Sequence, residues 1–143
     1  MPTTLPITNL STNILMKKTI KLVHPELSYK LIGILFDVYN ELGPGLKEKH
    51  YYKAIALALK NSGLVFKQQV PVTLKYKESK VGIDFLDFLV EDSVILEIKT
   101  GDRFLKRNID QVNEYLKATG LQLGILISFT KDGIKFKRIV NIN

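Results

Sequence analysis

The sequence predicts an α/β protein in which helices flank a mixed β-sheet, with elements in the order ααβββαββ. Apolar residues recur at helical spacing in two early segments and in one later segment, whereas the segments between and after them have the apolar patterns of strands. With 143 residues, of which 45% are hydrophobic and 24% charged, the chain has the size and composition of one folded domain. We therefore expect a single domain over residues 21–143.

The first helix is predicted to begin near Pro25, because proline followed by an acid suits the first turn of a helix. It should run to about Leu42, where the sequence GPG at 43–45 ends it. Its expected core stripe has four-three-four spacing and comprises Leu31, Leu35, Val38 and Leu42.

A second helix is predicted over roughly 46–61. Its apolar stripe comprises Tyr52, Ile55 and Leu59. Four residues before Tyr52 the same face carries Glu48, so we expect a carboxylate on the inward side of this helix.

Three strands are expected next, over 65–77, 81–90 and 93–100. Pro71 indicates that the first of them lies at an edge or contains a bulge, because proline cannot donate to a ladder. The short turn at 91–92 should join the other two as a hairpin.

The C-terminal part is predicted to contain a helix over 103–119, ended by Gly120. Its core stripe comprises Leu105, Ile109, Val112 and Leu116. A fully buried strand should follow at 123–129 and a half-exposed strand at 134–140.

Residues 1–20 contain two prolines and no acid and show no clean period, so we expect them to form a flexible arm. Met16 is an alternative natural start, which the intact mass of natively expressed protein tests. The positive charges follow the first apolar residues, unlike those of a secretory signal, so we expect a cytoplasmic location. The longest apolar run, at 121–129, is too short to span a membrane.

Composition excludes some chemistries. The chain has no cysteine, which excludes disulfides, thiolate metal sites and a cysteine nucleophile. Its net charge of +7 is concentrated in residues 99–143, where nine basic residues face four acids. A basic protein surface formed by this segment would attract polyanions such as nucleic acid. Charge that only improves solubility explains the excess of basic residues equally well.

The stretch DFLDFLVEDSVILEIKT, at 84–100, carries charges in apolar strands, where an ionised group is unfavourable unless it is compensated. Alternation places Glu97 and Lys99 on one side of their strand, and a hairpin brings Asp87 towards them. The two carboxylates repel each other unless a cation lies between them, and Mg²⁺ selects oxygen ligands. With Glu48 as a third acid, a divalent metal site is favoured over a surface Glu–Lys pair. Asp84 has the opposite strand parity and ranks below Asp87.

The predicted helix over 103–119 also has a polar stripe beside its core stripe. Gln111 and Tyr115 stand one turn apart on this stripe and should face the same way. The candidate phosphate-binding residues are basic and comprise Arg103, Lys106, Arg107, Lys135 and Lys137. A solvated helix face is the alternative interpretation.

These residues resemble the PD-(D/E)xK nuclease superfamily and, within it, the GxxExxY family. Residues 45–51 match the GxxExxY motif. The nuclease pattern of the superfamily is matched by Asp87, Glu97 and Lys99. Its QxxxY helix is matched by Gln111 and Tyr115. The resemblance covers about residues 24–141. Leu86 replaces the proline of the superfamily name, which removes no ligand.

The resemblance implies a restriction-endonuclease-like core and hydrolysis of phosphodiester bonds, in DNA, with Mg²⁺ or Mn²⁺ as cofactor. Asp87 and Glu97 would hold the metal, and Glu48 would add a ligand or position a metal-bound water. Lys99 would orient the attacking water or stabilise developing charge, and Gln111 and Tyr115 would contact substrate or fix the geometry of the site. A non-catalytic nucleic-acid-binding or regulatory module that keeps the fold is the alternative, and a homodimer is possible in either case.

Overall fold

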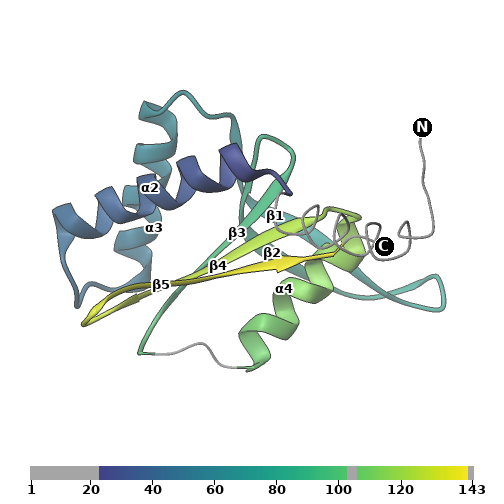
Figure 1. The fold of residues 1–143 in the computed structure, drawn as a ribbon. Helices are drawn as coiled ribbons and strands as arrows, with labels where there is room; N and C mark the ends of the chain where they lie inside the picture. The colour runs from purple at the N-terminus through teal and green to yellow at the C-terminus, as the bar shows by residue number, and fades with distance from the viewer. Residues whose placement is uncertain (1–22, 103–105, 142–143) are drawn as a thin grey trace, which may run out of the picture.

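The computed structural model describes residues 23–102 and 106–141, which form a five-stranded sheet with helices on both faces (Figure 1). The predicted fold class and the order ααβββαββ are confirmed. The elements are α2 (Pro25–Leu42), α3 (Glu48–Asn61), β1 (Phe66–Tyr76), β2 (Ser79–Val90), β3 (Val94–Thr100), α4 (Lys106–Thr119), β4 (Leu123–Thr130) and β5 (Gly133–Val140). The expected arm at 1–20 lies outside the described residues.

The sheet is mixed, with spatial order β1-β2-β3-β4-β5. Neighbouring strands are antiparallel except β3 and β4, which are parallel. Because parallel neighbours need a crossover connection, α4 lies between β3 and β4 in the chain and packs on one face of the sheet. Pro71 lies in β1, which forms one edge of the sheet, as the sequence predicted.

Two apolar clusters hold the helices on opposite faces of the sheet. One joins α2 and α3 to the sheet through buried residues that include Leu31, Leu35, Ile55, Leu59, Phe88 and Ile98. The other joins α4 to the opposite face and includes Leu86, Ile95, Val112, Tyr115, Leu116 and Leu126. Among the described residues, no helix is both long enough and apolar enough to cross a membrane.

One detail of the predicted helix stripes was wrong and one was confirmed only in part, while Leu105 lies outside the described residues. Leu42 is 38% exposed, because α2 ends there and the chain turns away at Gly43, where φ is +72°. In α3, Tyr51 is fully buried, whereas Tyr52 is half-buried and stacks on Phe88 with ring centroids 4.6 Å apart.

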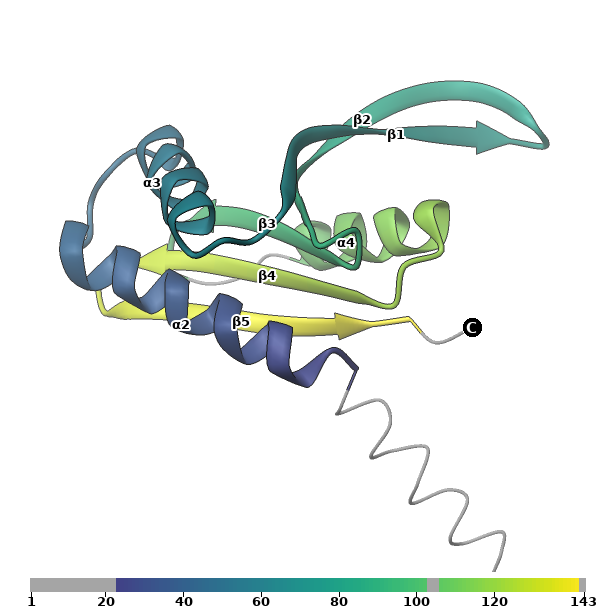
Figure 2. The same ribbon diagram turned by 90° about the horizontal axis from the view of Figure 1, so that it is seen from above.

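The β1–β2 ribbon bends sharply and curves over α4 (Figure 2). Phe88 packs in the α2–α3 cluster but Leu86, two residues earlier in the same strand, packs in the α4 cluster. In a regular strand, side chains two residues apart face the same side. Leu86 and Phe88 face opposite sides, so the alternation of side chains along β2 is interrupted at Asp87. Gln69 lies opposite in β1 with a φ of +49°, and the pairs on either side of this rung are Gln68 with Phe88 and Val70 with Leu86.

Gly124 allows α4 to pack closely on β4. A Cβ atom at this position would lie 2.5 Å from Cγ1 of Val112, and the stiff β-branched valine has little freedom to move aside. We expect Gly124→Ala to lower the free energy of unfolding by about 1 kcal/mol through overpacking. Urea unfolding of Gly124→Ala measures this, and the double variant with Val112→Ala should show a smaller loss than the sum of the two single changes. Additive losses would contradict the proposed contact.

Candidate active site

Asp87 and Glu97 meet where β2 separates from β3. The ladder between these strands ends at the pair Phe88–Leu96, one residue short of the two acids. Beyond that point the side chains replace the ladder: Glu97 Oε1 accepts a 2.6 Å hydrogen bond from the Asp87 backbone N–H, and Asp87 Oδ2 accepts a 2.9 Å bond from the Ile98 N–H. Each carboxylate thus satisfies a backbone donor of the opposite strand.

The environment disfavours negative charge on both acids. Glu97 is 3% exposed, and burial together with repulsion from Asp87 raises the pKa of Glu97 to about 8. Burial also raises the pKa of Asp87, while the Ile98 N–H and the charge of Lys99 oppose the increase. Lys99 therefore supplies part of the positive charge that this pair needs, and a bound cation would supply more.

Glu48 is brought near this pair by a turn that Tyr51 fixes. The Tyr51 hydroxyl donates a 2.6 Å hydrogen bond to the Gly43 carbonyl and accepts a 3.3 Å bond from the Leu46 N–H. Gly45, with a φ of +93°, completes the turn, and α3 then begins at Glu48. Burial raises the pKa of Glu48, and repulsion from Asp87 adds to the increase, whereas the positive charge of Lys99 opposes it.

Gln69 and Tyr52 contact Asp87, although the sequence did not identify them as site residues. Gln69 Nε2 donates to Asp87 Oδ1 at 3.5 Å, and the Tyr52 hydroxyl donates to the Asp87 carbonyl at 3.3 Å. Together with Glu48 and Lys49, these residues line a pocket of about 260 Å³. The hairpin register, which sets Gln69 opposite Asp87, was the signal that could have found Gln69.

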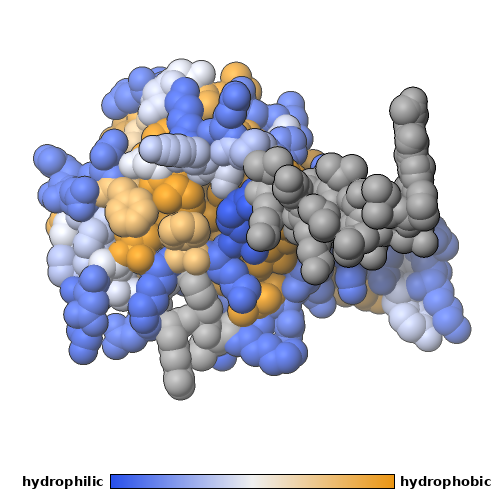
Figure 3. All heavy atoms as spheres, viewed as in Figure 1, coloured by the Kyte–Doolittle hydropathy of each residue, from blue (hydrophilic) through white to orange (hydrophobic). Residues whose placement is uncertain are grey.

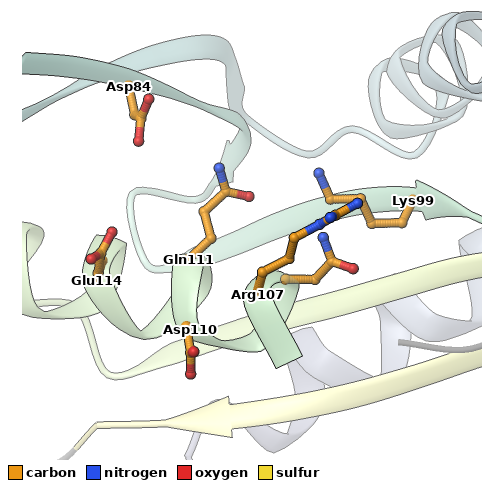
Figure 4. A pocket seen from close by; sticks show the side chains of 7 residues that line it. Asp84, Lys99, Arg107, Asp110, Gln111 and Glu114 are labelled. Carbon is orange, nitrogen blue, oxygen red and sulfur yellow. The ribbon is translucent and has the colours of Figure 1, made fainter. Parts of the chain in front are cut away.

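A second pocket, of about 420 Å³, lies on the α4 side of β3 (Figure 4). It is lined by Asp84, Lys99, Arg107, Asn108, Asp110, Gln111 and Glu114. Figure 4 shows Gln111 extending towards the space between Asp84 and Lys99, with Arg107 beside Lys99. The low rank given to Asp84 assumed a regular strand, whereas the bend at Asp87 brings Asp84 to this pocket.

Tyr115 lies beneath the site instead of beside Gln111 on its surface. It is 1% exposed, belongs to the α4 cluster, and its hydroxyl donates a 3.4 Å hydrogen bond to the Phe85 carbonyl. Burial and the nearby carboxylates, Glu97 first among them, raise the pKa of Tyr115 far above its ordinary value, so the phenol stays neutral. It acts as a donor that ties α4 to β2.

The sequence of the chain matches the family model of the PD-(D/E)XK nuclease superfamily over residues 25–139. The chain belongs to the PD-(D/E)XK nuclease superfamily. The match spans every element of the sheet, including the bend and both pockets. The narrower GxxExxY assignment rests on the sequence motif and stays a prediction.

Two solved structures are similar to this PD-(D/E)XK nuclease-superfamily chain, and the first of them supports the same fold. The structure of SSO0001 has 19% sequence identity and a TM-score of 0.54, over 66% of this chain and 50% of that one. An alkaline exonuclease from Laribacter hongkongensis has 16% identity and a TM-score of 0.45, over 61% of this chain and 52% of its own. The chain thus spans about half the length of these two structures. No curated protein sequence matches it.

PD-(D/E)XK nucleases generally use divalent metals, and the donor set here fits such an ion. Asp87 and Glu97 offer oxygen ligands whose mutual repulsion a cation would relieve. Within residues 23–102 and 106–141, no three His, Asp or Glu side chains are grouped closely enough to hold a metal. Mg²⁺ needs fewer, because it is usually held by one or two carboxylates together with water and substrate phosphates.

The predicted phosphate-binding residues of this PD-(D/E)XK chain are arranged unequally around the site. Arg107 lines the pocket beside Lys99, whereas Lys106 forms an exposed 2.7 Å ion pair with Asp110. On β5, Lys135 donates a 2.5 Å hydrogen bond to the Asp102 carbonyl, and Lys137 is exposed. Arg103 lies outside the described residues.

The sheet register relates the β5 lysines to the acids. Lys99 pairs with Ser128, which pairs with Lys135. Two residues earlier in β3, Glu97 is related in the same way through Leu126 to Lys137. Both lysines therefore lie two strands from the site, at a distance of roughly 10 Å if strands are about 4.8 Å apart.

Proposed function

We propose that this chain is a metal-dependent nuclease that hydrolyses phosphodiester bonds in DNA. The observation that carries the proposal is the meeting of Asp87, Glu97 and Lys99 at the point where β2 separates from β3. Membership of the superfamily adds support, because the same residues match its motif.

Asp87 and Glu97 would hold Mg²⁺ or Mn²⁺, and Glu48, in the first turn of α3, would position a water of the bound ion. A divalent ion bound there supplies Lewis acidity towards a phosphoryl oxygen and lowers the pKa of a bound water. Gln69 and Tyr52 hold Asp87 in place through its carboxylate and its carbonyl.

The remaining site residues act on the phosphate and on geometry. The Lys99 ammonium would stabilise negative charge that develops on the phosphoryl oxygens or orient the attacking water. The Gln111 amide, in the same pocket, would contact the substrate. Tyr115 would act as a positioning residue, because its neutral hydroxyl fixes β2 at Phe85, close to both Asp84 and Asp87.

Basic side chains would bind the flanking phosphates. Arg107 is the strongest candidate because it shares a pocket with Lys99. Lys135 and Lys137 would extend the contact across β5, whereas the ion pair with Asp110 weakens the contribution of Lys106. Arg103 stays a prediction from the sequence, as do the cytoplasmic location and the homodimer.

The alternative is a module that binds nucleic acid or regulates a partner without cutting. The net charge of +7 suits this function equally well, because contacts with phosphates require no metal. The two functions share the fold and the basic surface, so the assay must measure cleavage and binding separately.

The test is incubation of the purified chain with single-stranded, double-stranded and branched DNA, and with RNA, with EDTA, Mg²⁺ or Mn²⁺. We expect DNA cleavage that requires the divalent ion, and in Lys99→Met a loss of about 10²-fold or more, as for other charge-stabilising groups. Asp92→Asn, a surface change in the 3.2 Å ion pair with Lys67, should leave the rate unchanged. Binding without cleavage under every metal condition would support the alternative.

A further inference from the structure

The outer half of the β1–β2 ribbon exposes a strip of apolar side chains. Val81, Ile83 and Phe85 are 66%, 41% and 53% exposed and follow alternate positions of β2. Alternation places them on one face of the strand, opposite Leu86, which packs against α4. The strip is about 13 Å long at 3.3 Å per residue. Exposed apolar side chains that adjoin one another, unlike ones scattered singly, are a feature of binding surfaces.

Positive charge surrounds the far end of the strip. Residues 71–83 contain three lysines, Lys75, Lys77 and Lys80, against one acid, Glu78. Tyr76, 63% exposed, adds an aromatic ring at this end, with the Lys77 Nζ atom 5.4 Å from the ring centroid. Exposed rings interleaved with lysines suit a ligand that has both flat apolar groups and negative charges.

The near end of the strip leads to the candidate active site. Phe85 is two residues from Asp87, and its carbonyl accepts the hydrogen bond from Tyr115. The strip lies on the face of the ribbon turned away from α4. The pocket that contains Asp87 is also lined by Lys49 and Tyr52 of α3. A nucleic-acid strand bound along the ribbon would therefore reach Asp87 without crossing the β-sheet.

We propose that this strip binds the unpaired bases of single-stranded nucleic acid, with Phe85 as a stacking platform next to the site. The proposal rests on the proposed function and adds a preference for substrates with a single-stranded segment. A duplex keeps its base faces stacked inside, so it would leave the strip without a partner, whereas unpaired bases can stack on a ring.

A second copy of the chain is a weaker occupant. Each copy carries a net charge of +7, so two like-charged surfaces would meet. Three side chains also provide much less area than the roughly 800 Å² per partner that a stable interface usually buries.

Binding of the full chain to a labelled oligonucleotide in EDTA, measured by fluorescence anisotropy at fixed salt, tests the proposal without cleavage. We expect Phe85→Ala to weaken single-strand binding by about tenfold, the loss typical of removing one stacked base. Binding of the matching blunt duplex should change by less than about twofold, because phosphate contacts dominate it. Phe85→Trp should retain or strengthen single-strand binding.

Two variants separate stacking from apolar burial and from misfolding. Phe85→Leu keeps an apolar side chain but lacks a ring, so it should lose nearly as much affinity as Phe85→Ala while unfolding at the wild-type temperature. Phe36→Ala is the matched control, because Phe36 is 41% exposed in α2, which packs near β5 at the sheet edge opposite β1. Figure 3 shows apolar side chains gathered on the face of the molecule that carries α2. Phe36→Ala should bind like the wild type.

Single-strand affinity that is unchanged in both Phe85→Ala and Phe85→Leu would overturn the proposal, as would equal losses for single strand and duplex. A wild-type dimer in sedimentation velocity that Phe85→Ala converts to a monomer, with single-strand affinity unchanged, would assign the strip to a second copy instead. Failure of the nuclease proposal is distinct: metal-dependent cleavage would then be absent while Phe85-dependent binding of single strands persists.

Discussion

Replacement of Glu97 with glutamine is expected to reduce metal-dependent cleavage by about 10³-fold or more while making the metal-free protein more stable at pH 8. Glutamine keeps an oxygen that can accept the Asp87 N–H but removes the buried charge that repels Asp87. The free energy of unfolding should rise by about 2 kcal/mol at pH 8, because the folded wild type then carries an unfavourable carboxylate. Activity should fall because the ion loses one of its two principal ligands.

Two measurements on the same preparation test this result. Single-turnover cleavage in Mn²⁺ gives the activity, and urea unfolding in EDTA at pH 8 gives the stability. Asp92→Asn is the matched acid-to-amide control, since Asp92 is exposed at the far end of the same hairpin. A Glu97→Gln protein that cuts normally, or that is less stable than the wild type in EDTA, would contradict a metal site formed by Asp87 and Glu97.

The metal-free protein is also expected to lose stability as pH rises from about 5 to 8. The pKa of Glu97 lies near 8 in the folded protein, above its ordinary value of 4.5, so the folded protein holds a proton that the unfolded chain releases in this window. Stability from this group is fully present below pH 4.5 and is lost as pH approaches 8 and exceeds it. The raised pKa of Asp87 acts in the same direction, and we expect a total loss of about 2 kcal/mol for the pair.

A divalent ion should reverse this dependence. Metal binding requires deprotonated carboxylates, so Mn²⁺ should raise the unfolding temperature more at pH 8 than at pH 5.5. Thermal unfolding across pH, in EDTA and in Mn²⁺, measures both effects. Glu97→Gln should flatten the profile in EDTA, and Lys99→Met should keep the stabilisation by metal. A wild-type profile in EDTA that rises between pH 5 and 8 would contradict the raised pKa values.

Most of the fold could be predicted from the sequence because local signals and packing agree. Helix α2 begins at Pro25 and ends at Leu42, as proline, the acid at position 26 and GPG indicated. Strand β4 is buried along its whole length, as its continuous apolar run indicated. The two acids also lie together as expected, because the short hairpin at 91–92 allows few registers.

The errors and omissions at the site share a physical cause. Strand parity assigns side chains to faces only while the strand is regular, and β2 exchanges its faces at Asp87. Parity therefore gave no reason to place Asp84 in the pocket that it lines with Lys99 and Gln111. Gln69 was missed because its contact with Asp87 depends on long-range register and on the bend. Helical spacing placed Tyr115 beside Gln111, but the curved ribbon covers that part of α4 and buries the ring.

The reciprocal bonds between β2 and β3 also limit how this chain can diverge. At positions 87 and 97 a side-chain oxygen satisfies a backbone donor on the opposite strand, and this need remains when catalysis is no longer selected. If the proposed nuclease activity is lost in descendants of this chain, they should therefore show asparagine or glutamine at these positions more often than apolar residues. In such lineages, an amide in place of the acid would be the sequence mark of lost activity.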